Sequence, residues 1–189
     1  MALTYSRMTN LGDAAPAFDL PVSNPDADGL EGSTRSLVQL ADGKPLVVIF
    51  MCNHCPFVVH IEDAVVEVAR TWLSKGVQFV GISSNDARQY PADSFENMAR
   101  RAAEKRYPFP YLYDESQEIA VAYGAECTPD IFVYDSYLKL AYRGRFDGTR
   151  PGQGHPDGQD LVQALEELTT DGFVSMLQHP SMGCNIKWR

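Results

Sequence analysis

The sequence predicts an α/β sandwich in which a central mixed β-sheet is flanked by helices, and three observations support this prediction. An apolar run over residues 45–50 is typical of a short buried strand. The segment after it carries apolar residues at helical spacing, Ile61, Val65, Val68 and Trp72. Two more apolar runs, at 77–83 and 131–134, have the composition of core strands. This order predicts strands that are parallel first and antiparallel at the end.

An N-terminal extension, residues 11–44, precedes the first core strand. Phe18 and Leu20 alternate along an extended segment, and we expect both to point inward. Residues 24–33 are rich in Asp, Gly and Pro and predict a surface turn. Residues 36–40 fit either a short strand or one turn of helix.

Two helices are expected between the second and third core strands. Ser94 can cap a helix over residues 95–105, in which Glu96 and Arg100 form an i,i+4 pair. A brief helix over residues 117–123 precedes a glycine, which is the usual residue just beyond a helix end.

The last part of the chain predicts a hairpin and a helix. Strand 131–134 is expected to pair with an antiparallel partner at 138–143. The final helix covers residues 160–170, and residues 171–189 form a C-terminal tail. Because the chain has 189 residues and no repeats, we predict a single domain over residues 1–189.

The composition excludes some classes of partner. A net charge of −9 argues against binding to nucleic acids or anionic membranes. The longest apolar run is too short to span a bilayer, and residues 1–16 hold no apolar segment typical of a secretory signal. We therefore expect a cytoplasmic location, while the sequence gives no indication of the oligomeric state.

Cys52 and Cys55 stand at the junction between the first core strand and its helix. This position predicts both thiols on the first helical turn, where unpaired N–H groups and the helix dipole favour a thiolate. We expect Cys52 to be the exposed nucleophile with a lowered pKa and Cys55 to resolve the mixed disulfide. The pair therefore predicts thiol–disulfide exchange through a reversible disulfide bond.

Two other interpretations of the motif remain open, a metal site and inert packing. Cys52, His54 and Cys55 could together bind a metal ion. A structural zinc site needs four ligands, but Cys127 and Cys184 stand alone in the sequence. We therefore predict neither a metal nor a cofactor.

Four stretches in order resemble the thioredoxin superfamily, and within it peroxiredoxin-like proteins with a thioredoxin-type motif (AhpC/TSA-like redoxins). They are Gly12–Leu20, Cys52–Pro56, Cys127–Phe132 and Gly183–Trp188. The resemblance implies a thioredoxin-like sandwich. It also implies a cis peptide bond between Thr128 and Pro129, which would let the Thr128 backbone pair with an incoming peptide.

The chain departs from both parts of that superfamily. Thioredoxins usually have Trp before the first cysteine and Gly-Pro between the pair, where this chain has Met51 and Asn53-His54. Cys55-Pro56 aligns with the peroxide-attacking Cys-Pro of peroxiredoxins, and Cys52 replaces their threonine. No arginine stands just ahead of strand 131–134, where peroxiredoxins keep one.

Several neighbours of the cysteine pair are candidate supporting residues. A protonated His54 would favour the Cys52 thiolate, although it could equally be a surface histidine. Pro56 suits the start of a helix. Glu62 and Asp63 follow on that helix and are expected on its solvated face.

The two remaining cysteines are possible extra redox thiols. Cys127 lies two residues before Pro129, but a small core residue is the simpler interpretation. Cys184 could reach Cys52 or a partner, since chain ends are mobile by default. Alternatively, Ile186 and Trp188 anchor the tail and Cys184 is packed beneath it.

The leading functional hypothesis is a cytosolic thiol–disulfide oxidoreductase with an antioxidant role, whose partner is a disulfide protein or a small thiol. A thiol peroxidase that reduces hydroperoxides is the first alternative. A Cys/His metal carrier and a redox-inert binding module are the others. No cofactor is expected for any thiol-based activity.

Overall fold

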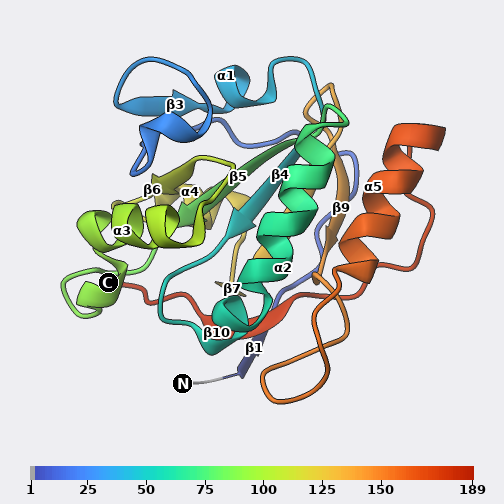
Figure 1. The fold of residues 1–189 in the computed structure, drawn as a ribbon. Helices are drawn as coiled ribbons and strands as arrows, with labels where there is room; N and C mark the ends of the chain where they lie inside the picture. Colours follow the sequence, from blue (N-terminus) through green and yellow to red (C-terminus); the bar gives the residue numbers. More distant parts are fainter. Residues whose placement is uncertain (1–2) are drawn as a thin grey trace.

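The computed structural model describes residues 3–189, and its centre is a five-stranded sheet with strand order β6-β5-β4-β8-β9 (Figure 1). The strands are β4 (Leu46–Phe50), β5 (Gln78–Ser83), β6 (Tyr111–Tyr113), β8 (Asp130–Tyr134) and β9 (Leu140–Gly144). β4, β5 and β6 run parallel, whereas β8 is antiparallel to β4 and to β9. The predicted mixed sheet is confirmed.

Helices cover both faces of this sheet. Val47 and Ile49 of β4 belong to the hydrophobic cluster shared with three helices, α2 (Pro56–Leu73), α3 (Phe95–Lys105) and α5 (Gln159–Asp171). Leu46, Val48 and Phe50 belong to the cluster shared with α1 (Leu37–Ala41) and α4 (Glu118–Tyr123). Alternate side chains of a strand point to opposite faces, so β4 is buried on both sides and its sequence is apolar throughout.

The ends of the short helices follow local sequence signals. Ser36 and Gln39 form a capping box, so residues 37–41 become helix α1 rather than a strand. Ser94 caps α3 by accepting a hydrogen bond from the backbone N–H of Asn97. Gly124 ends α4 with a φ of 63°, a conformation that costs glycine little.

The N-terminal extension packs on the α1/α4 face of the sheet. Phe18 and Leu20 are buried there, as the alternation predicted. β2 (Asp19–Pro21) pairs antiparallel with β3 (Thr34–Ser36). The predicted turn between them contains a short 3₁₀ helix, η1 (Pro25–Ala27).

The C-terminal tail forms part of a second sheet, which the sequence analysis did not predict. β10 (Met182–Asn185) lies between β1 (Leu3–Tyr5) and β7 (Cys127–Thr128), antiparallel to both. Figure 1 shows the red tail crossing the N-terminal end of α2. Of the two alternatives left open for the tail, a mobile end and a packed one, the structure has the packed one, because backbone pairing on both sides holds this segment.

The motif helix α2 carries one buried carboxylate that was expected in solvent. Glu62 is only 3% exposed, whereas Asp63 is exposed as predicted. Arg101 of α3 donates to Glu62 at 2.8 Å, and Tyr107 donates to the same carboxylate. The position is buried because α3 packs against α2 and supplies the partners that a buried charge needs.

Candidate functional site

The cysteine pair lies where β4 ends and α2 begins. Cys55 is the N-cap residue of α2, and Pro56 is its first helical residue. Proline suits this place because it has no N–H to leave unpaired and its φ matches the helix. The prediction that both thiols lie on the first turn needs correction, since Cys52 lies in the preceding loop.

Both sulfurs are shielded from solvent and face the same residue of β7. Cys52 is 1% exposed and Cys55 is 0% exposed, so the prediction of an exposed Cys52 is wrong. The Cys52 Sγ lies 3.6 Å from the Thr128 hydroxyl, and the Cys55 thiol donates to the Thr128 carbonyl at 3.0 Å. The Thr128–Pro129 peptide bond is cis, as the resemblance implied. No disulfide joins any of the four cysteines, all of which lie in the described part of the chain.

The two sulfurs have opposite pKa shifts. The hydrogen bond from the Cys52 thiol lowers the pKa of Cys55 to about 5, against the opposing effect of burial. The Thr128 hydroxyl, the Cys184 thiol and the Val58 N–H lower it further. The Thr128 carbonyl is the other contact of this sulfur, and it favours the protonated thiol.

Cys52 has the reverse environment. The pKa of Cys52 is raised well above its usual value by the hydrogen bond it gives to Cys55, by burial and by the nearby charge of Asp93. The pair therefore loses its first proton from Cys55. The sequence analysis assigned the thiolate to Cys52, whereas the contact with Cys55, burial and the charge of Asp93 favour the thiol form of Cys52.

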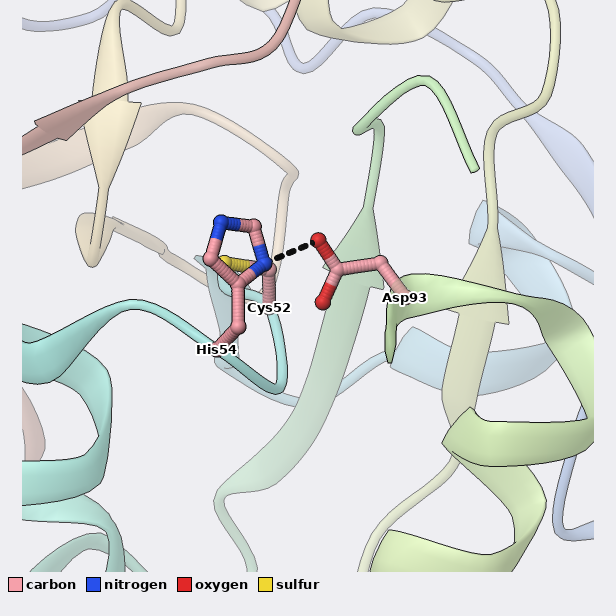
Figure 2. A group of neighbouring side chains, drawn as sticks. All are labelled: Cys52, His54 and Asp93. Carbon is pink, nitrogen blue, oxygen red and sulfur yellow. Dashed lines mark ion pairs between the residues drawn. The ribbon is translucent and has the colours of Figure 1, made fainter. Parts of the chain in front are cut away.

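His54 faces a buried carboxylate that the sequence analysis missed (Figure 2). Its Nδ1 lies 2.6 Å from Asp93, and its ring is stacked on that of Tyr90 at 5.3 Å. Asp93 belongs to the 3₁₀ helix η2 (Pro91–Asp93) and accepts hydrogen bonds from the Asn53 N–H and the Asn85 amide, both at 2.8 Å. No spacing in the sequence relates Asp93 to the cysteine motif, because the loop after β5 brings it there.

Cys52, His54 and Asp93 are also the residues of this site that could hold a metal ion. One ligand atom from each lies within 4.8 Å of the other two. Thiolate, imidazole and carboxylate are all zinc ligands. The alternative metal set considered from the sequence contained Cys55 instead of Asp93, and Cys55 is not part of the cluster that the structure forms.

The other two cysteines occupy neighbouring strands but differ in their contacts. Cys127 of β7 is fully buried, its thiol lies 3.5 Å from the Pro129 carbonyl, and its pKa is raised mainly by burial. Cys184 of β10 is paired opposite Thr128, and its thiol is a hydrogen-bond partner of Cys55. Burial and that contact raise the pKa of Cys184 to about 12.

Ile186 anchors the tail beyond Cys184, since it is buried in the cluster on the α1/α4 face. Trp188 is 41% exposed, so the expectation that both residues anchor the tail is correct only for Ile186.

A buried ion pair stands on the far side of the cis-proline. Burial raises the pKa of Asp130 to about 6, although Arg143 pairs with it at 3.3 Å. Arg143 also donates to the Gly124 carbonyl at 2.6 Å and lies over the ring of Phe132. Its guanidinium is thus held by partners outside the cysteine pair.

A pocket of about 210 Å³ opens beside the first turn of α2. Its wall includes Phe57, Ile61, Pro129, Arg145, Arg150 and Met182. It combines apolar surface with arginine side chains and touches both the cis-proline and the tail strand. The pocket meets the site at Pro129, and neither Cys52 nor Cys55 is part of its wall.

Solved structures similar to this chain include two full-length relatives. An uncharacterized conserved protein from Geobacillus kaustophilus is 46% identical, with 100% of this chain and 97% of that chain covered and a TM-score of 0.92. A hypothetical protein from Sinorhizobium meliloti 1021 is 41% identical, with 98% of each chain covered and a TM-score of 0.90. No curated protein matches the chain.

A more distant likeness identifies the fold. Peroxidoxin BcpB from Mycobacterium tuberculosis is 20% identical, covers 86% of this chain and 97% of its own, and gives a TM-score of 0.62. The predicted thioredoxin-like sandwich is confirmed. The family model for the AhpC/TSA family matches residues 11–143, which is well over half of the sequence. The chain therefore belongs to the AhpC/TSA family, with a redox function of the thioredoxin-like type.

Proposed function

We propose that the protein is a thiol–disulfide oxidoreductase that cycles Cys52 and Cys55 between dithiol and disulfide. The observation that carries this proposal is the placement of both sulfurs against Thr128 beside the cis-proline, with Cys55 at the start of α2, where the contact with Cys52 lowers its pKa to about 5. A thiolate is the attacking species in thiol–disulfide exchange. We therefore assign the attack to Cys55 and the closing step to Cys52.

In the first step the Cys55 thiolate attacks one sulfur of a substrate disulfide, and the other sulfur leaves as a thiolate. Cys55 then carries no negative charge, so the effect of that charge on the pKa of Cys52 is removed. Cys52 next attacks the Cys55 sulfur, the substrate thiol departs, and the proton of Cys52 goes to the departing sulfur. The enzyme is oxidised to the Cys52–Cys55 disulfide while the substrate disulfide is reduced to two thiols.

We propose a small thiol or disulfide as the partner. Neither sulfur of the pair is exposed, and the free edge of β7 beside Thr128 is covered by β10. A small molecule needs less displacement of the structure to reach such sulfurs than a folded protein does, and the pocket that contains Pro129 lies beside them. We include a cytoplasmic location in this proposal, because a catalytic Cys-x-x-Cys is typical of that compartment.

Stopped-flow mixing of the reduced protein with an oxidised small thiol tests the proposal. We expect fast formation of the Cys52–Cys55 disulfide, no reaction in Cys55→Ser, and a trapped mixed disulfide on Cys55 in Cys52→Ser. Fast reaction of Cys55→Ser through Cys52 would overturn the assignment of the two roles. An inert wild-type protein would overturn the function itself.

A thiol peroxidase is the second candidate, because Cys55 is a low-pKa thiol directly followed by Pro56 at a helix start. In this reaction the thiolate attacks the hydroperoxide, the O–O bond breaks, and Cys55 becomes a sulfenic acid. Cys52 then condenses with it to give the disulfide and water. Mixing the reduced protein with hydrogen peroxide separates the two candidates: a peroxidase reacts faster with the peroxide, and Cys52→Ser accumulates the sulfenic acid.

A further inference from the structure

The tail strand β10 brings a third thiol to the cysteine pair. Its backbone pairs with β7 in a register that places Cys184 opposite Thr128, the residue that contacts both Cys52 and Cys55. On its other edge β10 pairs with β1, where Cys184 is opposite Leu3. Pairing on both edges fixes Cys184 beside the site.

A close approach of two backbones positions this strand. A Cβ atom on Gly183 would lie 2.0 Å from the carbonyl oxygen of Thr128, a distance that real side chains do not adopt. Gly183 therefore lets β10 approach β7 closely enough for Cys184 to reach Cys55. Glycine is needed here because no side chain would fit between the two strands. Its backbone conformation is not the cause, since Gly183 does not have a positive φ.

The three sulfurs are ordered around Cys55. Cys55 is the hydrogen-bond partner of Cys52 and also of Cys184. Cys52, Cys55 and Cys184 all lie in one buried cluster. Thiol–disulfide exchange requires an attacking, a central and a leaving sulfur, and these contacts make Cys55 the central one.

We propose that Cys184 is a third redox thiol, which exchanges with the Cys52–Cys55 disulfide to give a Cys55–Cys184 disulfide and a free Cys52. The inference rests on the proposed function, which supplies the first disulfide. The Cys184 thiolate attacks the Cys55 sulfur, the Cys52–Cys55 bond breaks, and Cys52 leaves as a thiolate that takes up the proton of Cys184. One disulfide is present before and after, so no further oxidant is needed.

The electrostatics of the site place this step after oxidation. In the reduced protein burial and, next to it, the contact with Cys55 hold the pKa of Cys184 at about 12, so Cys184 stays a thiol, and only the part due to Cys55 is lost on oxidation. Once Cys55 is part of a disulfide, it carries no charge to oppose a second thiolate. The charge of Lys187 still favours the Cys184 thiolate. Cys184 is therefore a better nucleophile toward the oxidised pair than it is in the resting protein.

The exchange would have a structural consequence for the tail. The new disulfide joins β10 to the start of α2 and fastens the strand that covers β7. It also returns Cys52 to the thiol form, next to His54 and Asp93. The disulfide that a reductant meets would then contain Cys184, whereas the first disulfide was closed by Cys52.

Peptide mapping of the oxidised protein tests the inference. The full chain is treated with a stoichiometric amount of diamide, the remaining thiols are alkylated in acid, and disulfide-linked peptides are identified by mass spectrometry. We expect a fraction of wild-type molecules with Cys55 linked to Cys184 and Cys52 alkylated. In Cys52→Ser, the Cys55–Cys184 link should be the main product.

Matched variants exclude a general effect of losing a cysteine. Cys52→Ser/Cys127→Ser should still form the Cys55–Cys184 link, because the Cys127 thiol faces the Pro129 carbonyl. Gly183→Ala should lose the link and keep the Cys52–Cys55 disulfide. Gly148→Ala is its control, since a Cβ there would meet nothing closer than 3.5 Å.

The outcomes separate this inference from the proposed function. If wild type forms the Cys52–Cys55 disulfide while Cys184 is always alkylated, in Cys52→Ser as well, the third-thiol inference is overturned and the proposed function stands. If wild type forms no Cys52–Cys55 disulfide, the proposed function fails and the exchange step fails with it.

Discussion

Cys55 and Cys127 are equally buried, each 0% exposed, and yet their pKa values move in opposite directions. Burial alone raises the pKa of a thiol, since it disfavours the charged form. Cys127 follows this rule. Cys55 does not, because the Cys52 thiol and other donors are directed at its sulfur.

The difference comes from the elements that carry the two residues. Cys55 is the N-cap of α2, and the N–H of Val58, in the first turn of that helix, favours its thiolate. Cys127 lies in β7, whose backbone is paired with β10, and its thiol lies near a carbonyl rather than a donor. The comparison teaches that hydrogen-bond donors close to the sulfur, and not the extent of its burial, decide whether a thiol in this fold has a lowered pKa.

The largest expected effect is the loss of activity in Cys55→Ser. We expect the reaction with a small disulfide to fall by at least about a thousandfold, because the nucleophile is removed. Cys127→Ser should stay within about twofold of wild type, because Cys127 takes no part in the reaction. Stopped-flow rates measure both. If Cys55→Ser and Cys127→Ser lost the same share of the rate, the contrast drawn between Cys55 and Cys127 would be wrong.

The pH dependence of the thiolate should show the same contrast. The pKa of Cys55 is lowered to about 5, so its thiolate is present above that pH and is lost as the pH falls through it. The reaction rate should rise through about pH 5 and level off roughly one unit higher. The ultraviolet absorbance of the thiolate reports the same transition, which should persist in Cys127→Ser and vanish in Cys55→Ser. A transition that survives in Cys55→Ser would place the thiolate on another cysteine.

Replacing Thr128 by Val tests how much one hydrogen-bond donor, the Thr128 hydroxyl, contributes to the lowered pKa of Cys55. It removes the hydroxyl that favours the Cys55 thiolate while keeping the shape of the side chain. We expect the pKa of Cys55 to rise by up to about one unit, worth about 1.4 kcal/mol. The rate should therefore fall by up to about fivefold at pH 5 and very little near pH 8.

Thr128→Ser, which keeps a hydroxyl, is the control for that variant and should behave like wild type. An unchanged pH profile in Thr128→Val would show that the hydroxyl is not among the effective donors.

The smallest effect is expected from His54→Gln. Loss of the imidazole leaves the buried Asp93 carboxylate without its ion-pair partner, and its negative charge then disfavours thiolates nearby. A less stable reduced form makes the pair more reducing, by about 30 mV at most if the shift is one pKa unit. Equilibration with a thiol–disulfide buffer measures the potential. The exposed His155→Gln serves as the control, and a potential that rises in His54→Gln would contradict the argument.

The sequence was sufficient for the elements whose signals are local. The apolar run of β4, the helical spacing of α2 and the Ser94 cap each depend on neighbouring residues, and all three appear as predicted. The Cys52/Cys55 pair was found for the same reason, since its position between a strand and a helix can be read along the chain. The cis-proline was found only through family resemblance.

The tertiary structure decided which sulfur holds the charge and what surrounds it. Asp93, Thr128 and Cys184 lie far from Cys52 in the sequence, and only the packing of their segments brings them to it. A pKa depends on charges and donors within a few ångströms in space, whatever their separation along the chain. The sequence by itself therefore predicted a redox pair at Cys52 and Cys55, and only the tertiary structure showed surroundings that favour the thiolate on Cys55 and placed a third thiol beside it.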